Sequence, residues 1–134
     1  MMRLGNFLQR GFTLFELMIV MMIMAILVSI AVPTYKRSQI KARETVLLED
    51  LFQIRKAIDS FFADSERYPA ELSELVQGKY IRILPRDPFT GNAKSWVCVP
   101  PESDLNGSLQ QGECFDVHSS SDLVGLNGVA YKLW

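Results

Sequence analysis

The sequence contains little that would support catalysis or nucleic-acid binding. It has a single histidine, His118, and its 15 acidic residues slightly outnumber its 14 basic ones, which gives a formal net charge of −1. Domains that bind nucleic acid usually carry a clear basic excess, so this balance argues against that class of protein. The sequence also lacks a P-loop, a dinucleotide-binding fingerprint and zinc-ligand spacing. We therefore predict no enzyme activity, no catalytic residue and no nucleic-acid partner.

Charge is also missing from a long apolar stretch near the N-terminus. Between Gly11 and Tyr35 the only charged residue is Glu16, and none lies between Leu17 and Val32. A helix of this length spans roughly 37 Å, which exceeds the ~30 Å hydrocarbon core of a bilayer. We predict that residues 12–35 form a transmembrane helix and that residues 36–134 form a separate head.

Glu16 lies at the edge of this stretch, where an ionised side chain is costly without a partner. A secretory signal peptide cleaved at Ser29-Ile30-Ala31 fits the composition, and so does a plain single-span anchor. Neither explains the acid. Cleavage between Gly11 and Phe12 does explain it, because the new α-amine of Phe12 would pair with the Glu16 carboxylate of an adjacent, staggered helix. The pair would then set the register of a filament.

The run Gly11-Phe12-Thr13-Leu14-Phe15-Glu16-Leu17, after a short basic leader, resembles the processing site of type IV prepilins and type II secretion pseudopilins. The resemblance implies that prepilin peptidase removes residues 1–11 on the cytoplasmic side and methylates the amine of Phe12. Gly11, Phe12 and Glu16 match the family pattern one by one. Pro33 falls where family members often have a helix-weakening proline, so we expect a kink or local melting there.

The implied topology is a single-pass protein of the bacterial inner membrane with a periplasmic head. The positive-inside rule favours the opposite orientation, since four basic residues follow the apolar stretch and only two precede it. We give precedence to the processing motif, which requires a cytoplasmic leader.

The head begins with an amphipathic pattern. Apolar residues recur at spacings of 4, 3, 4 and 3, and this periodicity predicts that the N-terminal helix continues with one face turned toward a core. These residues are Leu47, Leu51, Ile54, Ile58 and Phe61. Tyr68-Pro69 would end the helix, a short second helix would cover Ala70–Gln77, and Gly78 would stop it.

Three strand-like runs follow, at residues 95–99, 114–118 and 129–134, with turn signals between them. The predicted fold class is α+β. A long N-terminal helix, half transmembrane and half amphipathic, packs on a small three-stranded antiparallel sheet.

The order of these parts, with Tyr68-Pro69 and Leu84-Pro85-Arg86-Asp87-Pro88, is similar to that of the major pseudopilin of type II secretion. The resemblance implies a pilin-like subunit that polymerises through its N-terminal helix into a periplasmic pseudopilus and drives protein export. Its implied partners are further copies of itself, minor pseudopilins, prepilin peptidase, the inner-membrane assembly platform and the outer-membrane secretin.

Two other functions remain open. One is a pilin of an extracellular type IV pilus for adhesion, motility or DNA uptake. The other is a periplasmic binding domain with a signal peptide cut after Ala31.

The resemblance also implies a calcium site in the loop before the last strand, because major pseudopilins bind Ca²⁺ there. Asp116, Ser119, Asp122 and Asn127 offer oxygen ligands for such a hard cation. Two carboxylates are a thin ligand set, and a solvated loop with Asx-type turns is the alternative.

Cys98 and Cys114 fall in two predicted neighbouring strands. In an oxidising periplasm we expect them to form a disulfide, and two buried thiols are the alternative.

Overall fold

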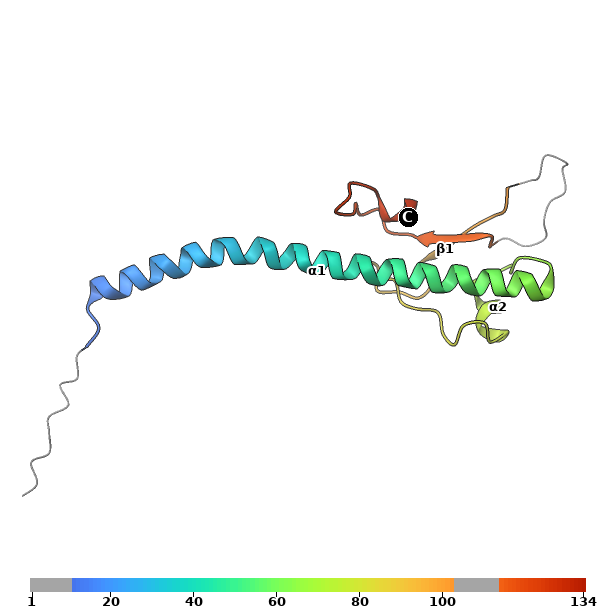
Figure 1. The fold of residues 1–134 in the computed structure, drawn as a ribbon, viewed down its shortest axis with the longest axis horizontal. Coiled ribbons are helices and arrows are strands. Elements are labelled where there is room, and N and C mark those ends of the chain that lie inside the picture. The colour runs from blue at the N-terminus through green and yellow to red at the C-terminus, as the bar shows by residue number, and fades with distance from the viewer. Residues whose placement is uncertain (1–10, 103–113) are drawn as a thin grey trace, which may run out of the picture. The chain divides into compact units, whose positions relative to one another are not determined.

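The computed structural model describes residues 11–102 and 114–134. Along the chain the elements are α1 (Leu14–Ser65), α2 (Leu72–Gln77), β1 (Trp96–Val99), β2 (Asp116–Ser119) and the 3-10 helix η1 (Tyr131–Leu133) (Figure 1). The chain divides into two compact units, Met1–Ser38 and Gln39–Trp134, and α1 contributes to both.

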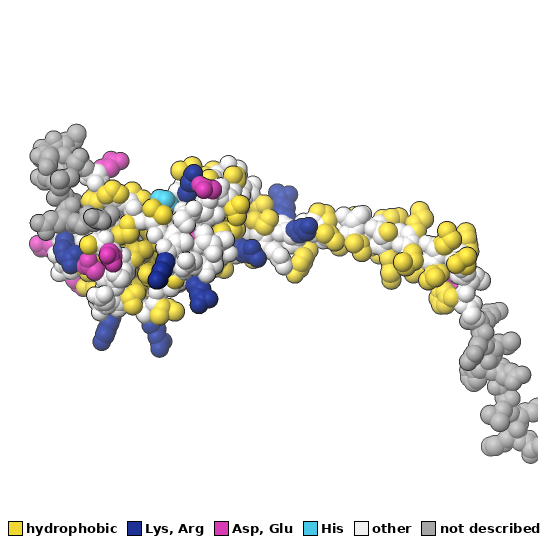
Figure 2. All heavy atoms as spheres, turned by 180° about the vertical axis from the view of Figure 1, so that it is seen from behind, with side chains coloured by type: hydrophobic (Ala, Val, Ile, Leu, Met, Phe, Trp, Pro, Cys, Tyr) yellow, Lys and Arg dark blue, Asp and Glu magenta, His cyan; other side chains and the backbone are white. Residues whose placement is uncertain are grey.

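In the first unit, α1 carries an apolar stretch that is long enough to cross a membrane. Its large hydrophobic side chains are exposed, and Figure 2 shows them over the surface of this stretch. Pro33 lies inside α1, and the helix is unbroken at this position. The predicted melting at Pro33 therefore stays a prediction.

The core of the second unit forms around the amphipathic part of α1. The predicted stripe is confirmed, since all five of its residues are buried, together with Ala57. The other elements cover this stripe with Leu72, Leu75, Trp96, Cys114, Val117 and Tyr131. The helix ends at Ser65, three residues before the predicted Tyr68-Pro69. Glu66 directly after it takes a left-handed backbone conformation with φ of 53°.

Helix α2 is confirmed, although it begins at Leu72 rather than at Ala70. Its C-cap is Gly78, as predicted. A Cβ atom at Gly78 would lie 2.7 Å from the ring of Tyr80, so a larger residue would displace this ring. Such a displacement would disturb the core, because the Tyr80 ring packs edge-on against Phe61.

The sheet has two antiparallel strands among the described residues. Trp96 of β1 pairs with Ser119 of β2, and Cys98 pairs with Val117. An α+β fold with a long helix and a small antiparallel sheet is therefore confirmed, and the predicted third strand is not.

Residues 129–134 form no strand. One isolated bridge joins Val124 to Ala130, and the chain then turns into η1. The spacing of the two aromatic residues explains the difference. A 3-10 helix has three residues per turn, so Tyr131 and Trp134 share one face, with ring centroids 5.1 Å apart. In a strand, residues three apart point to opposite faces.

The burial of α1 gives a matched pair of test positions. Leu47 is fully buried, whereas its neighbour Leu48 is 55% exposed. We expect Leu47→Ala to lower the free energy of unfolding by about 2–5 kcal/mol because it leaves a cavity. Leu48→Ala should change it by only about 0.5 kcal/mol. Denaturant unfolding of the full-length protein in detergent measures both values, and equal losses would contradict the assigned core face.

Candidate functional site

The start of α1 is organised by a side-chain cap. Gly11, Phe12 and Thr13 precede the helix, and the hydroxyl oxygen of Thr13 accepts a hydrogen bond from the backbone N–H of Glu16 at 3.2 Å. A threonine followed three residues later by a glutamate is the capping-box pattern, which satisfies the free N–H groups of a first helical turn. We did not predict this role for Thr13, although the Thr13-x-x-Glu16 spacing before an apolar run indicates it.

The cap places the Glu16 carboxylate in the first turn of α1. This position is favourable for an acid because the N-terminal end of a helix carries partial positive charge. Gly11, Phe12, Thr13 and Glu16 line a common open hollow, whereas Pro33, the third predicted assembly residue, lies farther along α1 and does not line it. Among residues 11–102 and 114–134, no cation forms an ion pair with Glu16.

In the head, a buried acid holds the Leu84–Pro88 loop. Asp87 is completely buried, and one of its carboxylate oxygens accepts the backbone N–H groups of Phe89 at 2.8 Å and Thr90 at 3.3 Å. The other oxygen accepts the hydroxyl of Ser119 on β2. Asp87 thus joins the loop to the sheet, which gives a physical reason for an acid at this position.

The charge of Asp87 affects the carboxyl group of Asp50 on α1. Partial burial, and then the negative charge of Asp87, raise the pKa of the Asp50 carboxyl above its usual range.

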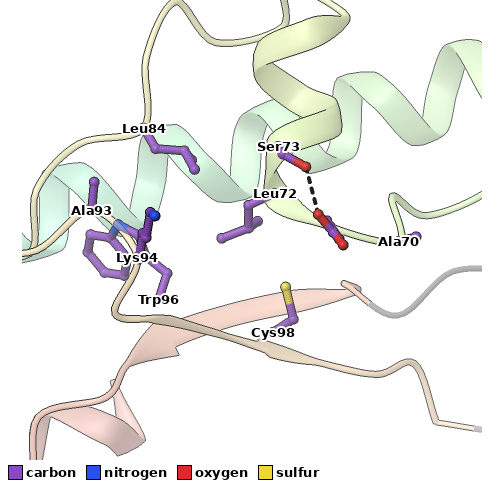
Figure 3. Close-up of a pocket in the computed structure, with 9 residues that line it drawn as sticks. Ala70, Leu72, Ser73, Leu84, Ala93, Lys94, Trp96 and Cys98 are labelled. Carbon is purple, nitrogen blue, oxygen red and sulfur yellow. Dashed lines mark hydrogen bonds between the residues drawn. The ribbon is translucent and has the colours of Figure 1, made fainter.

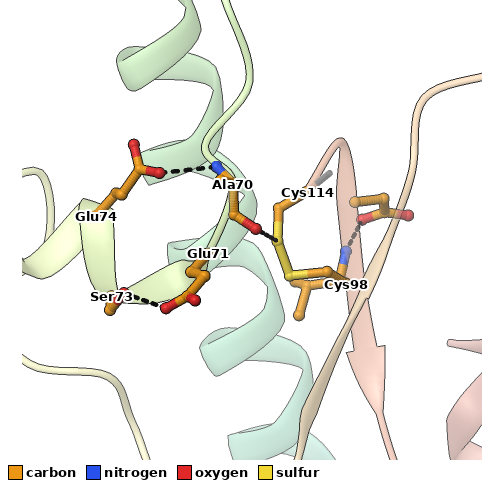
Figure 4. The surroundings of a disulfide bond; sticks show 8 residues. Ala70, Glu71, Ser73, Glu74, Cys98 and Cys114 are labelled. Atoms are coloured by element: carbon orange, nitrogen blue, oxygen red, sulfur yellow. Dashed lines mark hydrogen bonds between the residues drawn. A yellow bond between two sulfur atoms is a disulfide. The ribbon is translucent and has the colours of Figure 1, made fainter. Parts of the chain in front are cut away.

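Cys98 and Cys114 form a disulfide in the structure (Figure 4). Cys114 is fully buried, and its backbone N–H donates to the carbonyl of Pro69 at 3.0 Å. The same turn is braced by Glu74 of α2, whose carboxylate accepts the N–H of Ala70 at 3.0 Å. The disulfide therefore ties β1 to the start of β2 beside the turn that leads into α2.

A pocket lies between α2, the loop before β1, and β1 itself (Figure 3). Leu72, Leu84 and Trp96 form its apolar lining, and Lys94 and Glu71 also line it. The indole N–H of Trp96 is already bonded to the carbonyl of Pro85 at 2.9 Å. None of the residues that line the pocket is a free thiol or an imidazole, and the hydroxyl of Ser73 in this lining donates a hydrogen bond to the exposed carboxylate of Glu71 at 2.9 Å.

Each of the four predicted calcium ligands has a partner of its own in the structure. Asp116 pairs with Arg55 at 2.6 Å, and Asp122 pairs with Lys132 at 2.8 Å. The other two residues have different partners. The hydroxyl of Ser119 donates to Asp87, and the side-chain oxygen of Asn127 accepts the N–H of Val129. Within the described ranges, no three His, Cys, Asp or Glu side chains form a group that suits a metal. The predicted set contains only two carboxylates, so this finding does not test it, and the calcium site stays a prediction.

Comparison with known proteins places these features in a family. Residues 6–32 match the model for the prokaryotic N-terminal methylation motif, a range that includes Gly11, Phe12 and Glu16. The type II secretion system core protein G of Klebsiella michiganensis is 36% identical over 100 residues, covering 63% of this chain and 70% of the relative. The protein of the same name from Escherichia coli K12 is 33% identical over 109 residues, covering 69% and 73%.

This chain belongs to the core protein G family. A type IV major pilin, PilA of Myxococcus xanthus, is 38% identical over 66 residues, but this match covers 49% of the chain and 30% of the pilin. No solved structure matches the chain.

In this member of the core protein G family, a tyrosine near the end of the described chain has an unusual environment. Tyr131 is buried, it stacks on Phe89, and its hydroxyl donates to Glu44 of α1 at 2.9 Å. Burial, and then the hydrogen bond to Glu44, raise the pKa of Tyr131 to about 12. Both effects disfavour a tyrosinate at this position.

The raised pKa predicts a loss of stability at high pH. An unfolded tyrosine ionises near pH ~10, so between this value and about 12 the unfolded chain loses its proton before the folded one does. The contribution of Tyr131 is thus complete below pH ~10 and falls as the pH rises toward the folded value. Urea unfolding midpoints of the wild type and Tyr131→Phe, compared across this range, isolate the effect. Parallel curves for the two proteins would contradict it.

Proposed function

We propose that this chain is a structural, non-enzymatic subunit of the pseudopilus of a type II secretion system and that it polymerises through α1. The processing motif at the start of an exposed apolar helix carries the proposal, because residues 6–32 match the family model and the chain is similar to core protein G relatives. The capped helix start, with Glu16 in its first turn, supplies the group that assembly would use.

The assembly step follows from the cost of an isolated charge in an apolar environment. Removal of residues 1–11 would create a positive amine on Phe12, while Glu16 presents a carboxylate without a cation among the described residues. Side chains of the apolar stretch gain little by leaving lipid for a neighbouring helix, since both surroundings are apolar. Pairing the amine of one subunit with Glu16 of the next therefore contributes a large part of the specificity.

The same proposal assigns the orientation and the partners. The leader lies in the cytoplasm, where prepilin peptidase cuts after Gly11 and methylates Phe12, and the head lies in the periplasm. The Cys98–Cys114 disulfide supports an oxidising compartment for the head. The assembly would contain further copies of this chain and minor pseudopilins, and it would work with the inner-membrane platform and the outer-membrane secretin.

A pilin of an extracellular type IV pilus is the second candidate, and the similarity to the Myxococcus xanthus pilin is the observation in its favour. Deletion of the gene separates the two functions. Loss of exoenzyme secretion with normal twitching supports the pseudopilus, and the reverse result supports the pilus.

Substitution of Glu16 tests the charge pair. We expect Glu16→Ala and Glu16→Leu to be synthesised and processed but to be at least about tenfold less abundant in sheared filaments, since one partner of the pair is gone. Glu49→Ala removes an exposed carboxylate farther along the same helix and serves as the control. Normal filaments from both Glu16 variants would exclude the pairing mechanism.

The mass of the mature N-terminus tests the processing step. We expect peptide mapping of the purified protein to find a first residue, Phe12, that carries one additional methyl group. A chain that begins at Val32 would indicate a signal peptide, and a chain that retains Met1 to Gly11 would indicate a plain anchor. Either result would remove the amine on which the assembly mechanism depends.

A further inference from the structure

We infer that hydrogen bonds to side chains of α1, chiefly to Glu44, hold residues 120–134 against the helix. The head then needs no calcium to hold this segment. The inference rests on the described contacts of the segment and extends beyond the proposed function.

Glu44 makes the first attachment. One of its carboxylate oxygens accepts the backbone N–H of Leu126 at 2.7 Å and the hydroxyl of Tyr131 at 2.9 Å. Hydrogen bonds to an ionised group are stronger than those between neutral groups. A single half-buried carboxylate on α1 thus binds the segment at two points that are five residues apart.

Gly125 makes this close approach possible. A Cβ atom here would lie 3.0 Å from the Glu44 oxygen and 2.8 Å from the ring of Trp134. Both neighbours are already packed against the segment, so a side chain would push the segment away from the helix. The glycine is therefore part of the attachment.

Arg55 makes the second attachment, eleven residues farther along α1. Eleven residues are close to three helical turns, so Arg55 projects from nearly the same side of the helix as Glu44. Its guanidinium donates to the Asp116 carboxylate at 2.6 Å and to the backbone oxygens of Val117 at 3.1 Å and Trp134 at 2.9 Å. Arg55 therefore binds both the last residue of the segment and strand β2, which precedes the segment.

Two polar side chains of the segment have partners within the segment itself. Asp122 accepts a hydrogen bond from the ammonium of Lys132, and this contact lowers the pKa of the Asp122 carboxyl. Asn127 accepts the N–H of Val129 at 3.0 Å across the turn that contains Gly128. Calcium takes six to eight oxygens that converge on one point. Here the oxygens are committed to separate N–H, O–H and ammonium donors, and the Lys132 cation lies at the carboxylate that calcium would need.

Hydrogen exchange of the full-length protein in detergent tests the inference. The readout is the exchange rate of peptides that cover residues 123–131, measured by mass spectrometry in millimolar calcium and in excess EGTA. We expect identical wild-type rates in the two conditions. Glu44→Ala should exchange at least about tenfold faster in both conditions, since it removes two hydrogen bonds to a charged group.

Three further variants make the result specific. Glu49→Ala, an exposed glutamate on the same helix, should leave the exchange unchanged. Tyr131→Phe removes one of the two contacts to Glu44 and keeps the buried ring, so it should give a smaller increase in exchange rate. This variant provides the test if Glu44→Ala fails to fold. Glu44→Gln retains an acceptor oxygen and should exchange at a rate between those of the wild type and Glu44→Ala.

Two results would overturn the inference. One is slower exchange of residues 120–134 in calcium than in EGTA, which would show that a cation binds the segment. The other is equal exchange of Glu44→Ala and Glu49→Ala. Because purified protein is used, neither result bears on whether the chain assembles into a pseudopilus.

Discussion

Helix α1 is subject to two different requirements along one continuous stretch of backbone. Its first part carries exposed apolar side chains on all sides, which suits a lipid or helical environment, and its later part buries one stripe in the head. A helix can meet both requirements because its backbone hydrogen bonds are satisfied internally in either surrounding. The side chains then decide where each environment begins.

Three charged side chains of α1 lie in different surroundings. Glu16 occupies the first turn, where the helix end favours an anion and the apolar stretch penalises an unpaired one. Glu44 and Arg55 lie in the head and use their charge on neighbouring backbone and side-chain groups. The Glu44 and Arg55 side chains have hydrogen-bond partners elsewhere in the chain, whereas Glu16 forms no ion pair within residues 11–102 and 114–134.

Patterns over short distances in the sequence predicted the fold well. The spacing of Leu47, Leu51 and Ile54 identified the core face, because period and burial are linked directly in a helix. The positions of α2, β1 and β2 followed from local propensity and turn signals to within about two residues. The final strand was wrong because Tyr131 and Trp134 are placed by packing against one another and against Phe89, which local propensity does not report.

The contacts that hold the head together were not predictable in the same way. Glu44 meets Leu126 and Tyr131, which are 82 and 87 residues later in the sequence. No periodicity links residues at such separations, so the sequence alone left Glu44 as an ordinary charge on a helix face. The capping role of Thr13 was a different omission, because its signal lay within four residues.

A loop can be held by a bound cation or by donors from the chain, and the choice has a physical consequence. A cation organises carboxylates and carbonyls, so the loop order depends on the concentration of the ion. Glu44 reverses the arrangement, since it is an anion that organises an N–H and an O–H of the segment. The second compact unit begins at Gln39, only five residues before Glu44. The attachment through Glu44 therefore lies in the first turns of α1 that belong to this unit. It joins the last described segment of the chain to the core that forms around the helix.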